Sequence, residues 1–185
     1  MKALLFRGTL TMALSLLALT GSARAQDNDG CTNATLSGDY AFTVSGQIFI
    51  PNGPTIQREG IAMTHFDGAG HLTQVDFVLS SPNAAPPPGP APTDPATGFH
   101  NGETGEYTVN PDCTGNFEID NPSITTPSGA VIKGAIIRVK FVLSNHGRAI
   151  HTVVTSLTPP GAPGPVPALI RSEGHKLGRV PEERD

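Results

Sequence analysis

The sequence predicts an all-β protein, a single antiparallel up-and-down β-barrel of about eight strands. The first observation is composition: 21 Gly and 18 Pro in 185 residues, too many for a helical bundle because both residues interrupt helices. The second is pattern, since segments of alternating apolar and polar residues follow one another along the chain, separated by turn residues. Strands joined to their sequence neighbours close into a barrel or a sandwich, and a closed barrel leaves no exposed sheet edge.

Residues 1–25 have the features of a secretory signal peptide. Lys2 and Arg7 make the start basic, residues 10–20 form a short apolar run, and small residues lead up to Ala25. The run is shorter than the roughly 20 apolar residues that span a bilayer. We therefore expect cleavage after Ala25 and a protein exported to the periplasm or the extracellular space.

Export changes the charge of the chain. Loss of Lys2, Arg7 and Arg24 leaves nine basic residues against 16 acidic ones, a net charge of −7 instead of −4. The remaining basic residues are scattered, so no stripe exists to neutralise phosphates, and nucleic-acid binding is not expected. No second apolar run approaches membrane-spanning length, so no membrane span is expected either.

Cys31 and Cys113 are the only two cysteines. In an oxidising compartment a single pair favours one disulfide. A metal site or a catalytic thiol is the poorer alternative, because neither cysteine lies in a CxxC pair. Closing a loop of about 80 residues contributes on the order of 4 kcal/mol in the chain-entropy model.

Three strands are expected in the first half of the chain, at 40–50, 56–66 and 71–80. In the first, alternation places Tyr40 and Phe42 on the inner face, and Gly46 marks a bulge or a close backbone approach. A hairpin at 67–70 joins the second and third strands. In the third, the apolar residues expected to face inward are Val75, Phe77 and Leu79.

Five more strands complete the barrel, at 105–109, 116–120, 131–144, 148–157 and 168–177. The segment 131–144 is expected to be the longest strand, with Ile137, Val139 and Phe141 on its inner face.

Proline-rich segments interrupt this framework at 82–98, which holds seven prolines, and at 158–167. Proline removes a backbone donor, so both are expected to be surface loops of the barrel domain at 26–178. Segment 82–98 could alternatively dock an aromatic-lined groove of a partner. The charged tail, 179–185, is expected to be frayed.

Four stretches together resemble a known group of proteins: CTNATLSGDYAF (31–42), FDGAG (66–70), GEYTVNPDCTG (105–115) and NHGRAIHTVV (145–154). The group consists of small secreted bacterial proteins of unknown function, similar to the allene oxide cyclase-like, or calycin-like, β-barrels. The resemblance implies a barrel, and allene oxide cyclases isomerise a fatty-acid epoxide inside theirs. No catalytic motif of those enzymes matches this chain, so the resemblance assigns no catalytic residue.

The residues expected to line a barrel interior are aromatic: Tyr40, Phe42, Phe66, Phe77, Tyr107, Phe117 and Phe141. They would pack a filled core or, with a few polar groups such as the two tyrosine hydroxyls, line a ligand cavity. His65, His71 and Glu59 could form a metal or acid–base cluster at one hairpin, although exposed polar positions are the better interpretation. No metal or cofactor is expected, because phosphate-loop, His-x-x-x-His and nucleophile-elbow patterns are absent.

Three functions fit this sequence. The first is a secreted, non-enzymatic barrel that binds a small apolar ligand. The second is a cofactor-free isomerase or cyclase of the allene oxide cyclase-like type. The third is an envelope structural or interaction protein. The barrel interior discriminates among them: an enzyme needs an open cavity with a charged or hydrogen-bonding residue deep among apolar walls, and a closed core excludes both binding and catalysis inside.

Overall fold

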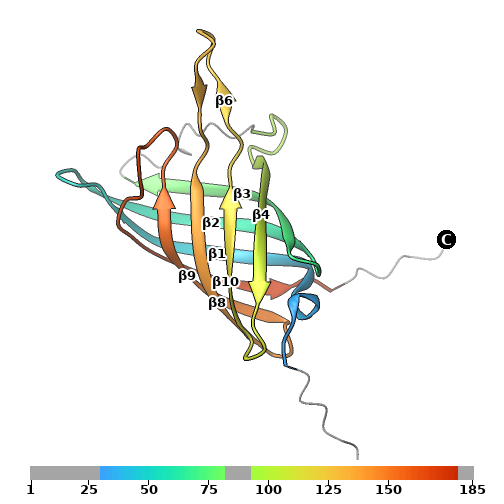
Figure 1. The fold of residues 1–185 in the computed structure, drawn as a ribbon. Coiled ribbons are helices and arrows are strands. Elements are labelled where there is room, and N and C mark those ends of the chain that lie inside the picture. Colours follow the sequence, from blue (N-terminus) through green and yellow to red (C-terminus); the bar gives the residue numbers. More distant parts are fainter. Residues whose placement is uncertain (1–29, 82–92, 179–185) are drawn as a thin grey trace, which may run out of the picture.

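The computed structural model describes residues 30–81 and 93–178, and these form a closed antiparallel barrel (Figure 1). Going round the barrel, the strands follow the order β1-β10-β9-β8-β5-β4-β3-β2, so neighbours in sequence are neighbours in space and β10 closes on β1. Their bounds are Ser37–Phe49 (β1), Thr55–Asp67 (β2), His71–Ser81 (β3), His100–Val109 (β4), Thr114–Asp120 (β5), Ile136–Ser144 (β8), Ala149–Thr158 (β9) and Ala168–Lys176 (β10). The predicted up-and-down barrel of eight strands is confirmed.

One predicted strand is shorter than expected. Instead of a continuous strand over 131–144, the chain forms β7 (Val131–Ile132), breaks, and enters the barrel as β8. Strand β7 pairs with β6 (Ile124–Thr125) in a small hairpin that projects from one end of the barrel (Figure 1). Gly134 lies within the break and packs closely on the chain after β5, because a Cβ there would lie 2.0 Å from the backbone oxygen of Asn121.

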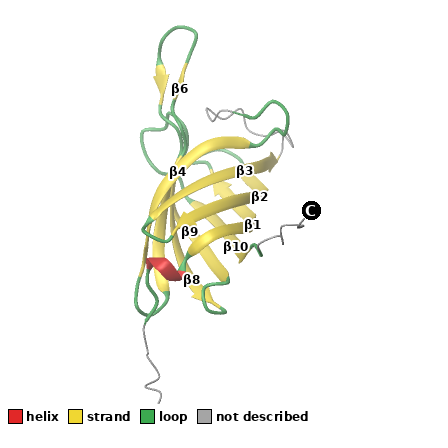
Figure 2. Cartoon of the chain, turned by 90° about the vertical axis from the view of Figure 1, so that its right-hand side faces the viewer, coloured by secondary structure: helices red, strands yellow, loops and turns green. Residues whose placement is uncertain are grey.

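The two ends of the barrel differ. At one end the connections are tight: turns at 68–70, 110–113 and 145–148, beside a 3-10 turn, η1 (Asn33–Thr35) (Figure 2). Asp67 closes the first of these turns, its carboxylate accepting hydrogen bonds from the backbone N–H groups of Ala69, Gly70 and His71. The opposite end carries longer connections, including residues 93–98, the proline-rich segment 158–167 and the β6–β7 hairpin. We call these the closed end and the open end.

The closed end contains a cluster of six packed aromatic side chains, which we call the aromatic core: Tyr40, Phe42, Phe66, Tyr107, Phe117 and Phe141. Phe66 packs edge-on against Tyr40 and Tyr107, with ring centroids 5.5 and 5.1 Å away. The Tyr40 hydroxyl donates to the Gly147 carbonyl, and the Tyr107 hydroxyl donates to the Leu36 carbonyl at 2.8 Å. Both hydroxyls therefore serve the fold, because each satisfies a backbone oxygen of a closing turn.

The predicted disulfide is confirmed at this same end. Cys31 and Cys113 are bonded, with Cα atoms 4.9 Å apart and 82 positions apart in sequence. The bond ties the segment before η1 to the β4–β5 turn, where Cys113 has a positive φ of 65°. The predicted close approach at Gly46 is also confirmed, since a Cβ there would lie 2.1 Å from the Leu169 carbonyl oxygen.

The prediction for the inner face of the third strand was wrong. Strand β3 turns Leu72, Gln74, Asp76 and Val78 inward and places Val75, Phe77 and Leu79 on the outer surface. Phe77 lies beside Phe99 there, with ring centroids 5.8 Å apart, and its neighbour on β2 is the half-exposed Ile61. The alternation is reversed because polar partners on β2 and β4 hold the polar side chains of β3 inside the barrel.

The predicted signal peptide (1–25) and tail (179–185) lie outside the described residues, as does 82–92 of the first proline-rich segment. Within the described part of the chain, no helix is long and apolar enough to cross a membrane.

Candidate functional site

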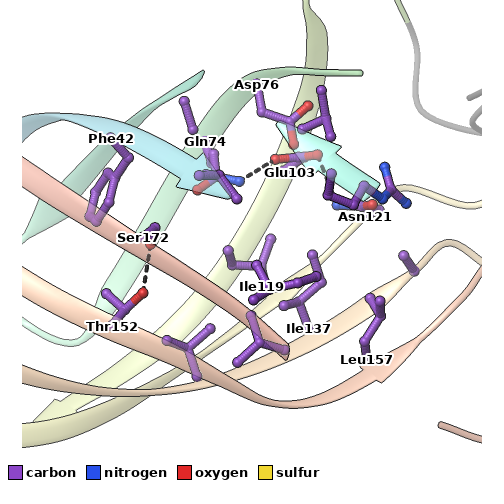
Figure 3. A pocket seen from close by; sticks show the side chains of 18 of the residues that line it. Phe42, Gln74, Asp76, Glu103, Ile119, Asn121, Ile137, Thr152, Leu157 and Ser172 are labelled. Carbon is purple, nitrogen blue, oxygen red and sulfur yellow. Dashed lines mark hydrogen bonds between the residues drawn. The ribbon is translucent and has the colours of Figure 1, made fainter. Parts of the chain in front are cut away.

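The barrel interior is only partly filled. Between the aromatic core and the open end lies a cavity of about 230 Å³ (Figure 3). It is larger than the roughly 150 Å³ engineered cavity that accepts benzene and smaller than the roughly 300–1,000 Å³ of typical drug-sized pockets. We call it the barrel cavity.

The predicted lining residues divide between core and cavity. Phe42 and Phe117 line the barrel cavity and also belong to the aromatic core, so they form the boundary between the two. The other predicted residues at the closed end, packed away from the cavity, are Tyr40, Phe66, Tyr107 and Phe141. Phe77 lies on the outer surface and is absent from the lining.

One side of the cavity is apolar. Strands β8, β9 and β10 build this side. We call it the apolar wall, and its residues are Ile137, Val139, Val154, Leu157 and Ile170. Ile137 and Val139 face inward as predicted from alternation along 131–144. The apolar wall carries one polar pair, in which the Thr152 and Ser172 hydroxyls hydrogen-bond to each other at 2.6 Å (Figure 3).

The opposite side is polar. Strands β2, β3 and β4 and the end of β5 build this side. We call it the polar wall, and its residues are Arg58, Gln74, Asp76, His100, Glu103 and Asn121. Two titratable residues of β4, His100 and Glu103, both reach this wall although three positions separate them. In a regular strand, residues three apart point to opposite faces.

A β-bulge resolves this conflict. Gln74 pairs with Glu103 and Asp76 with His100, so two steps along β3 match three along β4. The extra residue is accommodated at Gly102, which has a φ of +77° that L side chains rarely adopt. The bulge is therefore what places His100 and Glu103 on the same face.

Glu103 is only 2% exposed, and its carboxyl group is held at both oxygens. Gln74 Nε2 donates to Oε2 at 2.7 Å and Asn121 Nδ2 donates to Oε1 at 2.9 Å (Figure 3). Gln74 is fixed in turn by the Thr64 hydroxyl, which donates to its amide oxygen at 2.8 Å. Burial, assisted by the nearby charge of Asp76, raises the pKa of Glu103 to about 8. At neutral pH this residue is mostly a neutral acid with a proton to donate.

Asp76 and His100 form a second polar unit. The Asp76 carboxylate lies 2.9 Å from Nδ1 of His100, and the two side chains are 15% and 10% exposed. Burial raises the pKa of Asp76, while the hydrogen bond and charge of His100 and the more distant Arg58 oppose that shift. Burial also lowers the pKa of Arg58, with Asp76 opposing. A carboxylate on Nδ1 leaves Nε2 as the nitrogen of His100 that can accept a proton.

None of the polar-wall residues was predicted from the sequence. Binary patterning assigns the more apolar face of a strand to the interior, so it favours the face of Phe77 over the face that holds Gln74 and Asp76. The strand predicted at 105–109 actually begins at His100, five residues earlier. The useful signal was the second alternation in 71–80, where Leu72 and Val78 flank Gln74 and Asp76 on one face.

The His65 cluster does not assemble. His65 is 54% exposed and its Nδ1 contacts the Asp39 carboxylate at 2.7 Å, while His71 and Glu59 are exposed elsewhere on the surface. The prediction of exposed polar positions is confirmed. Within residues 30–81 and 93–178, no group of three or more His, Cys, Asp or Glu side chains is arranged to hold a metal ion.

A scan against protein-family models and a search of curated proteins each found no match. Among solved structures, the chain is similar to the crystal structure of Rv2717c from M. tuberculosis. The two are 11% identical, the match covers 78% of this chain and 94% of that one, and the TM-score is 0.33. That likeness is too distant to transfer any residue role or function.

Proposed function

We propose that this protein binds a small, largely apolar molecule with one hydrogen-bonding polar group inside its barrel. The observation that carries the proposal is the unfilled interior. Eight-stranded barrels either fill their interior with side chains or hold one small ligand. Here the aromatic core fills the closed end only, and the barrel cavity of about 230 Å³ remains beside it.

The distribution of polarity supports the ligand class. Binding sites for small molecules combine mostly apolar linings with a few convergent polar groups. The apolar wall would contact the body of the ligand. Glu103 and His100 on the polar wall offer hydrogen-bond partners for a single oxygen or nitrogen. The volume suits a monocyclic compound or a short chain.

Binding of p-cresol, a compound with one aromatic ring and one hydroxyl group, would test the proposal. The cavity is blocked by Val154→Trp, because Val154 is in the apolar wall. The matched control is Val153→Trp, the adjacent valine of β9, which is 50% exposed on the outer surface. Ligand-observed NMR should detect p-cresol binding to the wild type and to V153W but not to V154W. Equal signals for all three would place the binding outside the barrel and contradict the proposal.

Export is part of the same proposal. The Cys31–Cys113 disulfide supports it, because structural disulfides persist mainly in oxidising compartments. N-terminal sequencing of the protein from its host should begin after Ala25, and an intact Met1 would contradict export by cleavage.

A second candidate is a cofactor-free isomerase or cyclase. A buried acid facing an apolar cavity is the feature that separates an enzyme from a simple carrier, and Glu103 has that position. Incubation of candidate unsaturated substrates with the wild type and V154W, followed by product analysis, tests this candidate directly.

A further inference from the structure

We propose that the barrel cavity is a proton-transfer site that interconverts the keto and enol forms of a bound carbonyl compound, with His100 as base and Glu103 as acid. The inference rests on the proposed function, because the compound must first bind in the cavity. It goes further by naming a reaction, two catalytic residues and a substrate class.

The bulge in β4 is the first support. Without the extra residue, one of His100 and Glu103 would point away from the interior. Accommodating it requires Gly102 at a φ of +77°. Bulges occur often beside active sites, where they redirect a side chain. This bulge brings two titratable groups into one apolar-walled cavity.

The second support is the geometry around His100. Asp76 on Nδ1 orients the ring and favours the tautomer whose Nε2 has a free lone pair. The same carboxylate stabilises the imidazolium that forms when Nε2 takes a proton. Asp76 is thus a positioning residue.

The third support is the set of donors around Glu103. The amides of Gln74 and Asn121 point N–H groups at both carboxyl oxygens, so they stabilise the carboxylate left after the proton has gone. Burial raises the pKa of Glu103 to about 8, so the side chain keeps its proton near neutral pH. The site is therefore arranged for both states of the acid.

The reaction balances without any co-reactant. His100 Nε2 takes a proton from the carbon next to the carbonyl. The electron pair of that C–H bond becomes the C=C bond, and the carbonyl π pair moves to oxygen, which receives the proton of Glu103. Reversal returns the proton to the same carbon or, in a conjugated system, to a more distant one. General acid and base groups of this kind typically contribute 10²–10⁴-fold each.

The test uses cyclohexanone in D₂O, because exchange of its α-hydrogens for deuterium reports proton abstraction directly by NMR. Exchange by the wild type and V153W should be at least tenfold faster than by V154W, E103Q or H100Q. Surface carboxylates and histidines are common to all variants, so V154W supplies the background. Asp76→Asn should shift the pH dependence of exchange while p-cresol still binds.

One arm of the test needs no substitution. Excess p-cresol should suppress exchange by the wild type to the V154W rate, whether or not the polar-wall variants fold. If p-cresol binds but wild-type exchange equals the V154W rate, proton transfer is refuted and the binding function stands. If neither p-cresol binding nor exchange depends on the cavity, both proposals fail.

Discussion

The carboxylate of Asp76 on β3 meets Nδ1 of His100 on β4 at 2.9 Å inside the barrel, where both side chains are largely shielded from solvent. This pair lies across from an apolar wall and beside a second buried acid, Glu103. A buried carboxylate costs folding free energy unless partners compensate it. Two buried acidic side chains, Asp76 and Glu103, thus lie beside the barrel cavity, and the proposed ligand-binding function can be tested through them.

The stability of the protein should depend on the ionisation of Glu103. In the unfolded chain the Glu103 carboxyl group loses its proton near pH 4.5, whereas in the folded protein it keeps the proton until about pH 8. The folded state therefore holds the extra proton in between, and the free energy of unfolding should fall as pH rises from 5 to 8. One such group contributes up to about 1.4 kcal/mol per pH unit, and the raised pKa of Asp76 acts in the same direction.

The Glu103→Gln variant removes that titration while Asp76, His100 and Arg58 remain around the site. Urea unfolding at pH 5, 6.5 and 8 should give a flatter profile for E103Q than for the wild type. Its amide can be accommodated because the Gln74 amide can turn over and exchange donor for acceptor. Parallel profiles for the two proteins would mean that Glu103 is ionised at neutral pH.

The bulge should be more important for the cavity than for the fold. Gly102→Ala forces an L residue to a φ of +77°, at a cost of about 1–2 kcal/mol. Gly129→Ala is the matched control, with a φ of +83° in the turn between β6 and β7 and nothing within 4 Å of the new Cβ. Both variants should lose similar stability in urea, but only G102A should weaken p-cresol binding. Equal binding by the two variants would show that the bulge does not shape the site.

The disulfide should stabilise the barrel without affecting the cavity. Cys31 and Cys113 lie at the closed end, and the loop that they close contributes on the order of 4 kcal/mol in the chain-entropy model. A C31S/C113S double variant should unfold at lower urea concentration and, while folded, bind p-cresol with unchanged affinity. Loss of binding by the folded double variant would mean that the closed end controls the cavity.

The two tyrosines should resist ionisation together. The chain contains only Tyr40 and Tyr107. Burial, together with the charge of Tyr107, raises the pKa of Tyr40 to about 12, and burial also raises that of Tyr107. Ultraviolet titration of the folded protein at pH 10 should therefore give well under half of the tyrosinate absorbance of the urea-unfolded chain. Equal absorbance would place at least one hydroxyl in solvent.

Local pattern was sufficient to predict most of the framework. Alternation located all eight barrel strands, and glycine and proline located the turns, because both signals depend on residues close in sequence. The cysteine pairing followed from there being only two. These features need no knowledge of which strand lies beside which.

The polar wall could not be predicted in the same way. Asp76 is inside because His100, 24 positions later, compensates its charge, and His100 faces inward only through the bulge at Gly102. Such pairing depends on register between strands separated by a long loop, which alternation within one strand does not encode. Apolar Phe77 and Leu79 then made the wrong face of β3 look like the inner one.

The most direct measurement is native mass spectrometry of the protein purified from its own host, compared with V154W and V153W expressed in the same way. We predict an additional small-molecule mass on the wild type and on V153W, lost on gentle activation and absent from V154W. Fragmentation of the released compound would then identify its carbonyl or other polar group. A ligand-binding barrel would be contradicted if all three proteins carried the same small-molecule mass. It would also be contradicted if none of them carried one and p-cresol binding did not depend on the cavity.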